Sequence, residues 1–462
     1  MADNNSTLET FRSFGPDQNR LRRQTIRPWI YPLTIKLFLV SVFALLSSSP
    51  YVGSDRSQKL ASTFASVPKN VVPPKSHQFK IRTITSGVNL KNTSDLATIE
   101  SAIGFLQRAR KKFEDEGFEI QTVRIATQPF PEYLNGKTRR EALADLKKID
   151  ELANANGVLL SIGPVITGDR HDPEFALWAT QLLKETKNIN FSVSVASPER
   201  GVHGQTALTA AEAIVAIAHT TPGGEGNFRF TAAANCVPGT PFFPVAYHQG
   251  PDAFSIGLES PGLLQEAFAE AKDIQAAKAR LKSLLESALR PVEEMALGVA
   301  RSEHRQYLGI DVSPAPSKEA SIGSAIETLT RMPFGSASTL AACAAITDVL
   351  HSLSIKTCGY SGLMLPVLED PVLAQRATEG RYTVRELLLY SSVCGTGLDV
   401  VPLAGDTPAN ELAALIRDVA ALSTKLHKPL SARLFPVPGK KAGERAEFKN
   451  PFLTSSVVMK LD

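Results

Sequence analysis

Cysteine is scarce in this sequence. The four cysteines lie far apart, form no CxxC pair and show no Cys/His spacing typical of a metal site. This argues against a disulfide scaffold and a structural zinc site, and it suits a reducing compartment. An excess of one charge is also missing, because 50 basic and 46 acidic residues leave a net charge of only +4, which argues against a nucleic-acid-binding protein. Glycine and proline, at 30 residues each, are too few for a collagen-like or low-complexity chain.

A long hydrophobic run is absent as well. Residues 29–46 are mostly apolar, but Lys36 interrupts them and leaves only residues 37–46 as an apolar core, whereas a membrane-spanning helix needs about 20 residues. Arginines precede this stretch and serines follow it, which is typical of a signal sequence or signal anchor. The alternative is an unstructured extension, or a start codon assigned too far upstream.

Residues 1–76 are therefore interpreted as a leader and linker, since 54–76 is rich in serine, lysine and proline. The folded part is expected over 77–462. A genuine targeting segment would make the protein membrane-anchored or secretory, with membrane contact through 29–46. Without one, the folded part is expected in the cytoplasm.

From residue 78 onward, strand-like segments alternate with helical ones. The pattern predicts ten strands, at 79–88, 119–127, 158–165, 190–196, 228–235, 253–260, 307–313, 355–365, 398–403 and 430–437. Helical segments between most of them indicate parallel βαβ units buried on both sides. Ten strands exceed the eight of a TIM barrel. The fifth and sixth are joined by a loop, which is where two five-stranded halves are expected to meet.

Four segments carry a resemblance to a known family. In chain order they are KIRTITSGVNL, ANCVPGTPFFPVAYHQGPDAFSIGLESPG, LGIDVSPAPS and CGTGLDVVPLAGDTP. Together they resemble the DUF711 / UPF0210 family over residues 78–462. The resemblance implies a ten-stranded α/β barrel of the pyruvate formate-lyase and ribonucleotide reductase type. It implies little about chemistry, because the family has no assigned function and a fold does not establish one.

The glycyl-radical chemistry of that superfamily can be checked on the residues. It needs an Arg-Val-x-Gly-type loop near the C-terminus and a thiol that relays the radical. The last thirty-odd residues contain Gly439 and Gly443 but no such loop. Cys236 could supply a thiol, but a thiol alone is not a radical system. Non-radical chemistry is therefore expected.

Four acidic or basic side chains are the catalytic candidates. His248, Glu259, Asp311 and Asp399 each follow or nearly end a predicted strand, where α/β barrels place their ligand sites. His248 with Glu259 or Asp311 would form a general acid–base pair or two ligands of a divalent metal. No other cofactor is indicated. In the alternative interpretation, His248 packs in its Pro/Phe-rich loop and donates to a backbone carbonyl.

Four further residues are candidates for ligand binding. Arg82 and Arg124 lie inside predicted strands, where a guanidinium is costly unless it is paired or binds a ligand. They could hold a carboxylate or phosphate, or pair structurally with Asp311 or Glu259. Asn235 ends the fifth strand, and Ser361 lies in a Gly-Tyr-Ser-Gly turn.

These residues predict an enzyme that acts on a small polar or anionic metabolite by acid–base or metal-assisted chemistry. The first alternative is a metabolite-binding regulatory or scaffold protein without turnover. The second is a membrane-anchored structural protein in which the leader matters most. A small molecule is the expected partner, with no nucleic acid, and the sequence leaves the substrate and the oligomeric state open.

Overall fold

The computed structural model describes residues 79–461, so the predicted leader at 1–76 lies outside the described residues. Nine of the ten predicted strands form, along with a two-residue strand, β5 (Gly201–Val202). The nine are β1 (Lys80–Val88), β2 (Ile120–Thr127), β3 (Val158–Ile166), β4 (Ile189–Ser197), β6 (Phe230–Ala234), β7 (Ala253–Glu259), β8 (Gln306–Pro314), β9 (Gly397–Ala404) and β10 (Leu430–Val437).

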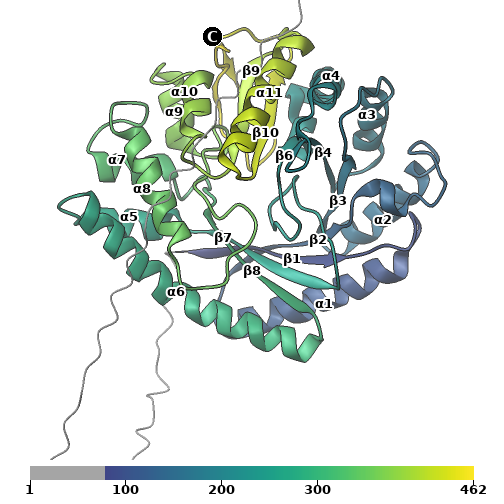
Figure 1. Ribbon diagram of the computed structural model, residues 1–462, viewed down its shortest axis with the longest axis horizontal. Coiled ribbons are helices and arrows are strands. Elements are labelled where there is room, and N and C mark those ends of the chain that lie inside the picture. Colours follow the sequence, from purple (N-terminus) through teal and green to yellow (C-terminus); the bar gives the residue numbers. More distant parts are fainter. Residues whose placement is uncertain (1–78, 462) are drawn as a thin grey trace, which may run out of the picture. The chain divides into compact units, whose positions relative to one another are not determined.

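These strands form one mixed sheet in the order β8-β7-β1-β2-β3-β4-β6-β10-β9, with β5 paired to β4 (Figure 1). Strands β1, β2, β3, β4 and β6 are mutually parallel, as are β7 with β8 and β9 with β10. The first group, β1, β2, β3, β4 and β6, runs opposite to the second group, β7 to β10. This follows because β1 pairs antiparallel with β7 and β6 pairs antiparallel with β10. The fifth and sixth predicted strands, β6 and β7, are therefore not neighbours.

The predicted strand at 355–365 does not form. This segment makes only isolated parallel bridges, Thr357 with Ile310 of β8 and Pro366 with Asp399 of β9. Its backbone turns at Gly359 and Ser361, which have φ values of 64° and 43°, and a left-handed backbone cannot continue an extended strand.

Helices lie outside the sheet and cover it (Figure 1). They are α1 (Leu96–Asp115), α2 (Leu143–Ala155), α3 (Phe175–Glu185), α4 (Gly204–Thr220), α5 (Pro261–Ala269), α6 (Ile274–Glu303), α7 (Ile322–Thr330), α8 (Thr339–His351), α9 (Pro371–Thr378), α10 (Val384–Tyr390) and α11 (Ala409–Leu426). Their apolar faces pack on strands that are buried along nearly their whole length. No helix within residues 79–461 is long and apolar enough to cross a membrane.

The loop between β6 and β7, residues 235–252, lies against strands of the first group. Thr85 Oγ1 of β1 donates to the Pro241 carbonyl at 2.9 Å, and Ser161 Oγ of β3 donates to the Ala246 carbonyl at 2.7 Å. The His248 backbone N–H donates to the Thr127 carbonyl of β2 at 2.8 Å. These bonds satisfy buried polar groups and hold the loop beside the sheet.

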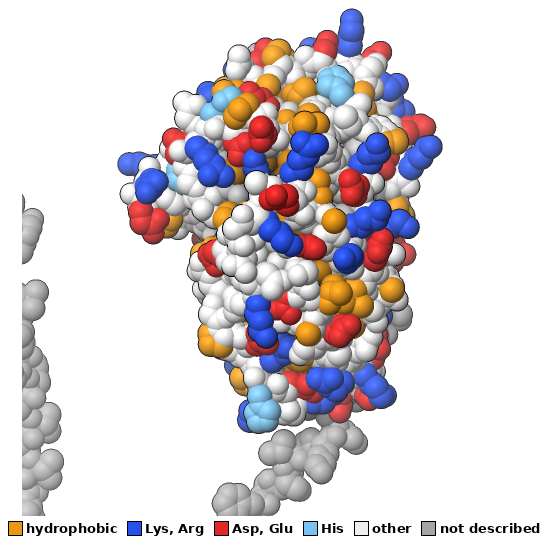
Figure 2. All heavy atoms as spheres, turned by 90° about the vertical axis from the view of Figure 1, so that its right-hand side faces the viewer, with side chains coloured by type: hydrophobic (Ala, Val, Ile, Leu, Met, Phe, Trp, Pro, Cys, Tyr) orange, Lys and Arg blue, Asp and Glu red, His pale blue; other side chains and the backbone are white. Residues whose placement is uncertain are grey.

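The surface charge agrees with the nearly balanced composition. On the face drawn in Figure 2, basic and acidic side chains are interspersed over the whole view. That face therefore presents no continuous patch of one sign of charge.

Candidate functional site

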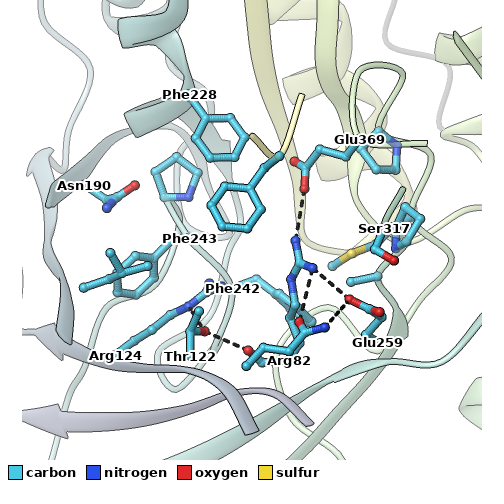
Figure 3. Close-up of a pocket in the computed structure, with 18 of the residues that line it drawn as sticks. Arg82, Thr122, Arg124, Asn190, Phe228, Phe242, Phe243, Glu259, Ser317 and Glu369 are labelled. Atoms are coloured by element: carbon cyan, nitrogen blue, oxygen red, sulfur yellow. Dashed lines mark hydrogen bonds and ion pairs between the residues drawn. The ribbon is translucent and has the colours of Figure 1, made fainter. Parts of the chain in front are cut away.

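A cavity of about 1280 Å³ is bordered by nearly every strand of the sheet (Figure 3). At least one residue from each of eight strands lines it, among them Arg82 (β1), Arg124 (β2), Leu159 (β3), Asn190 (β4), Thr231 (β6), Glu259 (β7), Asp399 (β9) and Arg433 (β10). Phe242 and Phe243 of the β6–β7 loop add apolar surface. A large concave site with a few convergent polar groups is the usual form of a small-molecule site.

Most strands present their N-terminal or middle parts to the cavity, as β1, β2, β4 and β6 do, whereas β7 presents its C-terminal end. The sequence predicted a site at the C-terminal ends of the strands throughout. The antiparallel junctions explain the difference, because they bring the start of β1 beside the end of β7, with Lys80 opposite Glu259.

Five charged side chains form a continuous ion-pair chain on one wall, in the order Glu259–Arg82–Glu369–Arg433–Asp399. Arg82 donates to Glu259 Oε2 at 2.9 Å and lies 3.4 Å from Glu369 Oε2. Arg433 donates to Glu369 Oε1 at 2.6 Å and to Asp399 Oδ1 at 2.7 Å. All five side chains are at most 15% exposed, so water screens these pairs little.

Strand irregularities place two members of this ion-pair chain. Between β1 and β7, Ile81 pairs with Leu258 and Thr83 with Gly257, so Arg82 is an extra residue. Between β9 and β10, Leu398 pairs with Ala432 and Val401 with Leu434, so β9 also carries an extra residue, and Val400 has a φ of 43°. A positive φ is strained for a β-branched residue. Such bulges redirect side chains, often beside functional sites.

The carboxylates control the protonation of Arg433. Burial on its own lowers the pKa of this guanidinium, but the adjacent charges of Asp399 and Glu369 outweigh burial and raise the pKa above its usual range. Arg433 is therefore a fixed cation.

Arg124 lacks such partners. It is 8% exposed, its Nε donates to Thr122 Oγ1 at 3.1 Å, and its guanidinium lies 5.0 Å from the centre of the Phe243 ring. Among the described residues, no carboxylate pairs with it. Burial, together with the nearby Arg82 charge, lowers the pKa of Arg124 to about 9, so it is still a cation at neutral pH. A buried cation without an anion is unfavourable unless a ligand supplies one.

Comparison with known proteins agrees with the motifs. A family model described as "Uncharacterised ACR (DUF711)" matches residues 75–450. The chain belongs to the DUF711 family. A UPF0210 protein of Pyrobaculum islandicum is 31% identical, with 79% of this chain and 87% of the relative covered. Those of Syntrophobacter fumaroxidans and Methanopyrus kandleri are each 28% identical, covering 81% and 79% of this chain and 89% and 88% of the relatives. The predicted family membership is confirmed.

For this DUF711 member, four of the eight predicted site residues line the cavity: Arg82, Arg124, Glu259 and Asp399. Arg82 pairs with Glu259, which was the structural alternative for this arginine. Arg124 pairs with neither Asp311 nor Glu259. The remaining four, His248, Asp311, Asn235 and Ser361, are not among the residues that line the cavity.

His248 does not contact Glu259 or Asp311. It is fully buried, its Nε2 donates to the Gly250 carbonyl at 3.0 Å, and its Nδ1 has no partner among the described residues. Burial lowers the pKa of His248. These contacts match the alternative in which His248 packs in its loop. Strand direction explains why His248 and Glu259 are apart. The loop binds Thr127 at the C-terminal end of β2, whereas Glu259 lies beside Lys80 at the start of β1.

Asp311 and Ser361 hold a turn together. The Asp311 carboxylate accepts hydrogen bonds from the backbone N–H groups of Ser313, Tyr360 and Ser361 and from Ser313 Oγ. Burial raises the pKa of Asp311 to about 6, although these bonds oppose the shift. Ser361 Oγ donates to the Cys358 carbonyl at 2.7 Å. Both side chains are thus engaged with backbone.

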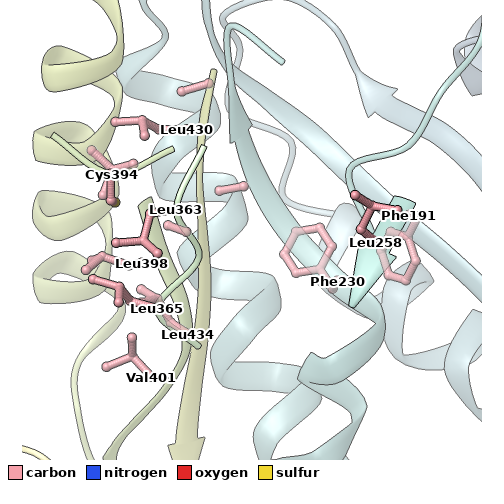
Figure 4. Close-up of a cluster of buried hydrophobic side chains, with 14 of the residues drawn as sticks. Phe191, Phe230, Leu258, Leu363, Leu365, Cys394, Leu398, Val401, Leu430 and Leu434 are labelled. Carbon is pink, nitrogen blue, oxygen red and sulfur yellow. The ribbon is translucent and has the colours of Figure 1, made fainter. Parts of the chain in front are cut away.

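Asn235 and Cys236 lie at the other end of the first strand group, beside a small void of about 30 Å³. Asn235 Nδ2 donates to Ser423 Oγ at 2.9 Å. Burial raises the pKa of Cys236 to about 12, so its thiol stays protonated. Cys394 is also buried, packed with Leu363, Leu398 and Leu430 in the core (Figure 4).

Two residues of the ion-pair chain were not predicted. Arg433 lies inside a strand, in the same situation that singled out Arg82 and Arg124, so the same criterion would have found it. Glu369 precedes the capping residue of α9 in an irregular segment and carries no such signal. Within residues 79–461, no group of three or more His, Cys, Asp or Glu side chains is arranged to hold a metal ion.

Proposed function

We propose that this protein is an enzyme that binds a small anionic metabolite inside a closed α/β barrel and acts on it by non-radical acid–base chemistry. The observation that carries the proposal is Arg124, a buried cation at the cavity wall without a carboxylate partner in the described chain.

Two observations support closure of the barrel. The segment after β8 bridges to β8 through Thr357 and to β9 through Pro366, and these are the two outer strands of the sheet order. The cavity also takes lining residues from strands along the whole sheet, as a barrel interior would. This arrangement supports the ten-stranded pyruvate formate-lyase type, with 355–366 in place of the tenth strand.

The lining charges support an anionic ligand. Nine basic and seven acidic side chains border the cavity, so the wall is positive overall before a ligand binds. Arg124 Nη1 and Nη2 have no protein partner among the described residues, and a planar guanidinium is suited to bidentate binding of carboxylate or phosphate.

The carboxylates Glu259 and Asp399 support acid–base chemistry. Glu259 uses Oε2 for Arg82 and Gln121, and Asp399 uses Oδ1 for Arg433. Within the described chain, their other oxygens, Oε1 and Oδ2, have no hydrogen-bond partner. Each is therefore available to accept a proton from a bound molecule.

One observation favours a second candidate function, binding without turnover. All three carboxylates of the ion-pair chain are paired with arginine, and a paired polar network can hold a cavity wall together without taking part in a reaction. A regulatory protein that binds a metabolite without turnover would have the same ion-pair chain in its cavity wall.

The anion site is tested by replacing Arg124. With inorganic phosphate, succinate and citrate as probes, Arg124→Met is expected to weaken binding by about tenfold to a hundredfold, the loss of a charge-assisted hydrogen bond. Arg124→Lys keeps the charge and is expected to recover part of the affinity. Calorimetry gives the dissociation constants. Arg108→Met, which removes an exposed arginine paired with Glu303 on the outer helices, is the matched control. Equal affinities in Arg124→Met and the native protein would refute the site.

Turnover separates the two candidates. Mass spectrometry of a metabolite extract incubated with the protein is expected to show depletion of an anionic compound. The depletion should be lost in Asp399→Asn while the anion still binds. A compound that is retained unchanged would favour the regulatory protein.

A further inference from the structure

Arg124 and the carboxylates of the ion-pair chain lie on opposite sides of the cavity (Figure 3). Arg124 of β2, the exposed Lys187 just before β4 and Asn190 of β4 line the cavity, and β3 lies between β2 and β4 in the sheet. Neither cation forms an ion pair with a described residue. Figure 3 shows Arg124 and Asn190 on one side of the cavity, with Glu259 and Glu369 on the other.

The opposite wall carries an excess of negative charge. Its ion-pair chain contains three carboxylates and only two guanidinium groups. Lys80 forms ion pairs with Glu119 at 3.1 Å and Glu319 at 3.8 Å, outside the ion-pair chain. The free oxygens Glu259 Oε1 and Asp399 Oδ2 belong to this wall.

Two buried hydroxyl groups of the cavity lining also lack partners. Thr231 on β6 and Thr396 just before β9 are 1% and 2% exposed, and both line the cavity. Neither Oγ1 atom has a hydrogen-bond partner among the described residues. Buried hydroxyls are normally satisfied, so this pair indicates a polar group of a ligand or water in the cavity.

We propose that the ligand is a zwitterion, with a carboxylate or phosphate bound by Arg124 and a protonated amine or guanidinium bound by Glu259 and Asp399. This rests on the proposed function for the anionic end and adds the cationic end. The aromatic wall, with Phe228, Phe242 and Phe243, accommodates an apolar body between the two charges.

A purely anionic ligand would pair with only one of the two charged sides of the cavity. It would neutralise Arg124 but leave the excess negative charge opposite, where a second anionic group would be repelled. A diamine would leave Arg124 unpaired. Only a molecule with both charges satisfies both sides.

The experiment uses ω-amino acids as probes, from β-alanine to ω-aminododecanoate, since their polymethylene chains vary the distance between the two charges. Each is compared with its N-acetyl form, which lacks the cation, and its carboxamide form, which lacks the anion. At the matching length, the free amino acid is expected to bind about tenfold or more tightly than either capped form, as one charge-assisted contact is lost in each.

Variants assign the two ends. Arg124→Met is expected to remove the preference over the carboxamide form, and Asp399→Asn the preference over the N-acetyl form. Glu259→Gln provides the same test if Asp399→Asn does not fold. Glu303→Gln, outside the cavity, is the control for loss of a carboxylate.

The outcomes separate the two proposals. Equal binding of the amino acid and its N-acetyl form at every length would overturn the zwitterion while leaving the anion site intact. Absence of binding by every ω-amino acid would also overturn it, and the phosphate and succinate measurements would still decide the proposed function.

Discussion

Arg433 Nε lies 2.7 Å from Asp399 Oδ1, across the pair of parallel strands β9 and β10. The contact forms where β9 carries one extra residue, and Val400 beside it has a φ of 43°. Backbone strain of this kind costs about 1–3 kcal/mol and persists where the surroundings fix it. Here Val400 packs with Leu368 and Phe435 on the other side of the strand.

Arg433→Met is expected to reduce the free energy of unfolding by about 3–5 kcal/mol. The substitution leaves Glu369 and Asp399 buried with one fewer cation, and uncompensated buried charge is costly. Chemical denaturation of the variant and the native protein measures the difference. Arg108→Met, which breaks an exposed pair, should cost at most about 1 kcal/mol. Similar losses of stability in the two variants would contradict the interpretation that the ion pairs of Arg433 are buried and coupled.

Gly87 and His248 form a second testable pair. A Cβ at position 87 would lie 2.3 Å from His248 Nδ1, so Gly87→Ala is expected to lower stability by about 1–3 kcal/mol through overpacking. His248→Ala should also lower it, because a buried ring is lost. In the double variant the clash is absent, so its loss of stability should be clearly less than the sum of the losses in the two single variants. Additive losses in the double-mutant cycle would show that the ring and the glycine are not in contact.

Asp311 gives a pH dependence of stability. Its folded pKa of about 6 lies above the ordinary value of 3.8 because of burial, so between these values the folded state binds more protons than the unfolded state. Its contribution to the free energy of unfolding therefore falls as pH rises from 3.8 to about 6, by at most about 3 kcal/mol, and is constant above.

The comparison with Asp311→Asn isolates this contribution from that of the other carboxylates. Because asparagine does not titrate, the stability difference between native and variant proteins should shift toward the variant as pH increases across that interval. Denaturant titrations at several pH values measure it. Two parallel stability curves would contradict the raised pKa of Asp311.

Residues 1–76 are predicted to be dispensable for folding, given the composition break before residue 77. A chain of residues 77–462 is expected to melt cooperatively at the same temperature as the full chain. Insolubility or loss of the cooperative transition would rule this out.

Local patterns predicted the strands well but not their directions. Segments such as 80–88 and 430–437 are recognisable because apolar and β-branched residues run through them. The antiparallel pairing of β1 with β7 depends on the path of the loop at 235–252, which no periodicity encodes. Strand direction in turn determines which candidate residues line the cavity: Glu259 lines it, whereas His248 does not.

The ion-pair chain Glu259–Arg82–Glu369–Arg433–Asp399 also constrains how the sequence can diverge. Each inner member is shared between two neighbours of opposite charge, so replacing one member disturbs the balance of the next. A relative without an arginine at the position of Arg433 is expected to carry a neutral residue at that of Glu369 or Asp399 as well. These five positions are distant in the chain, and we expect their residues to change together among relatives.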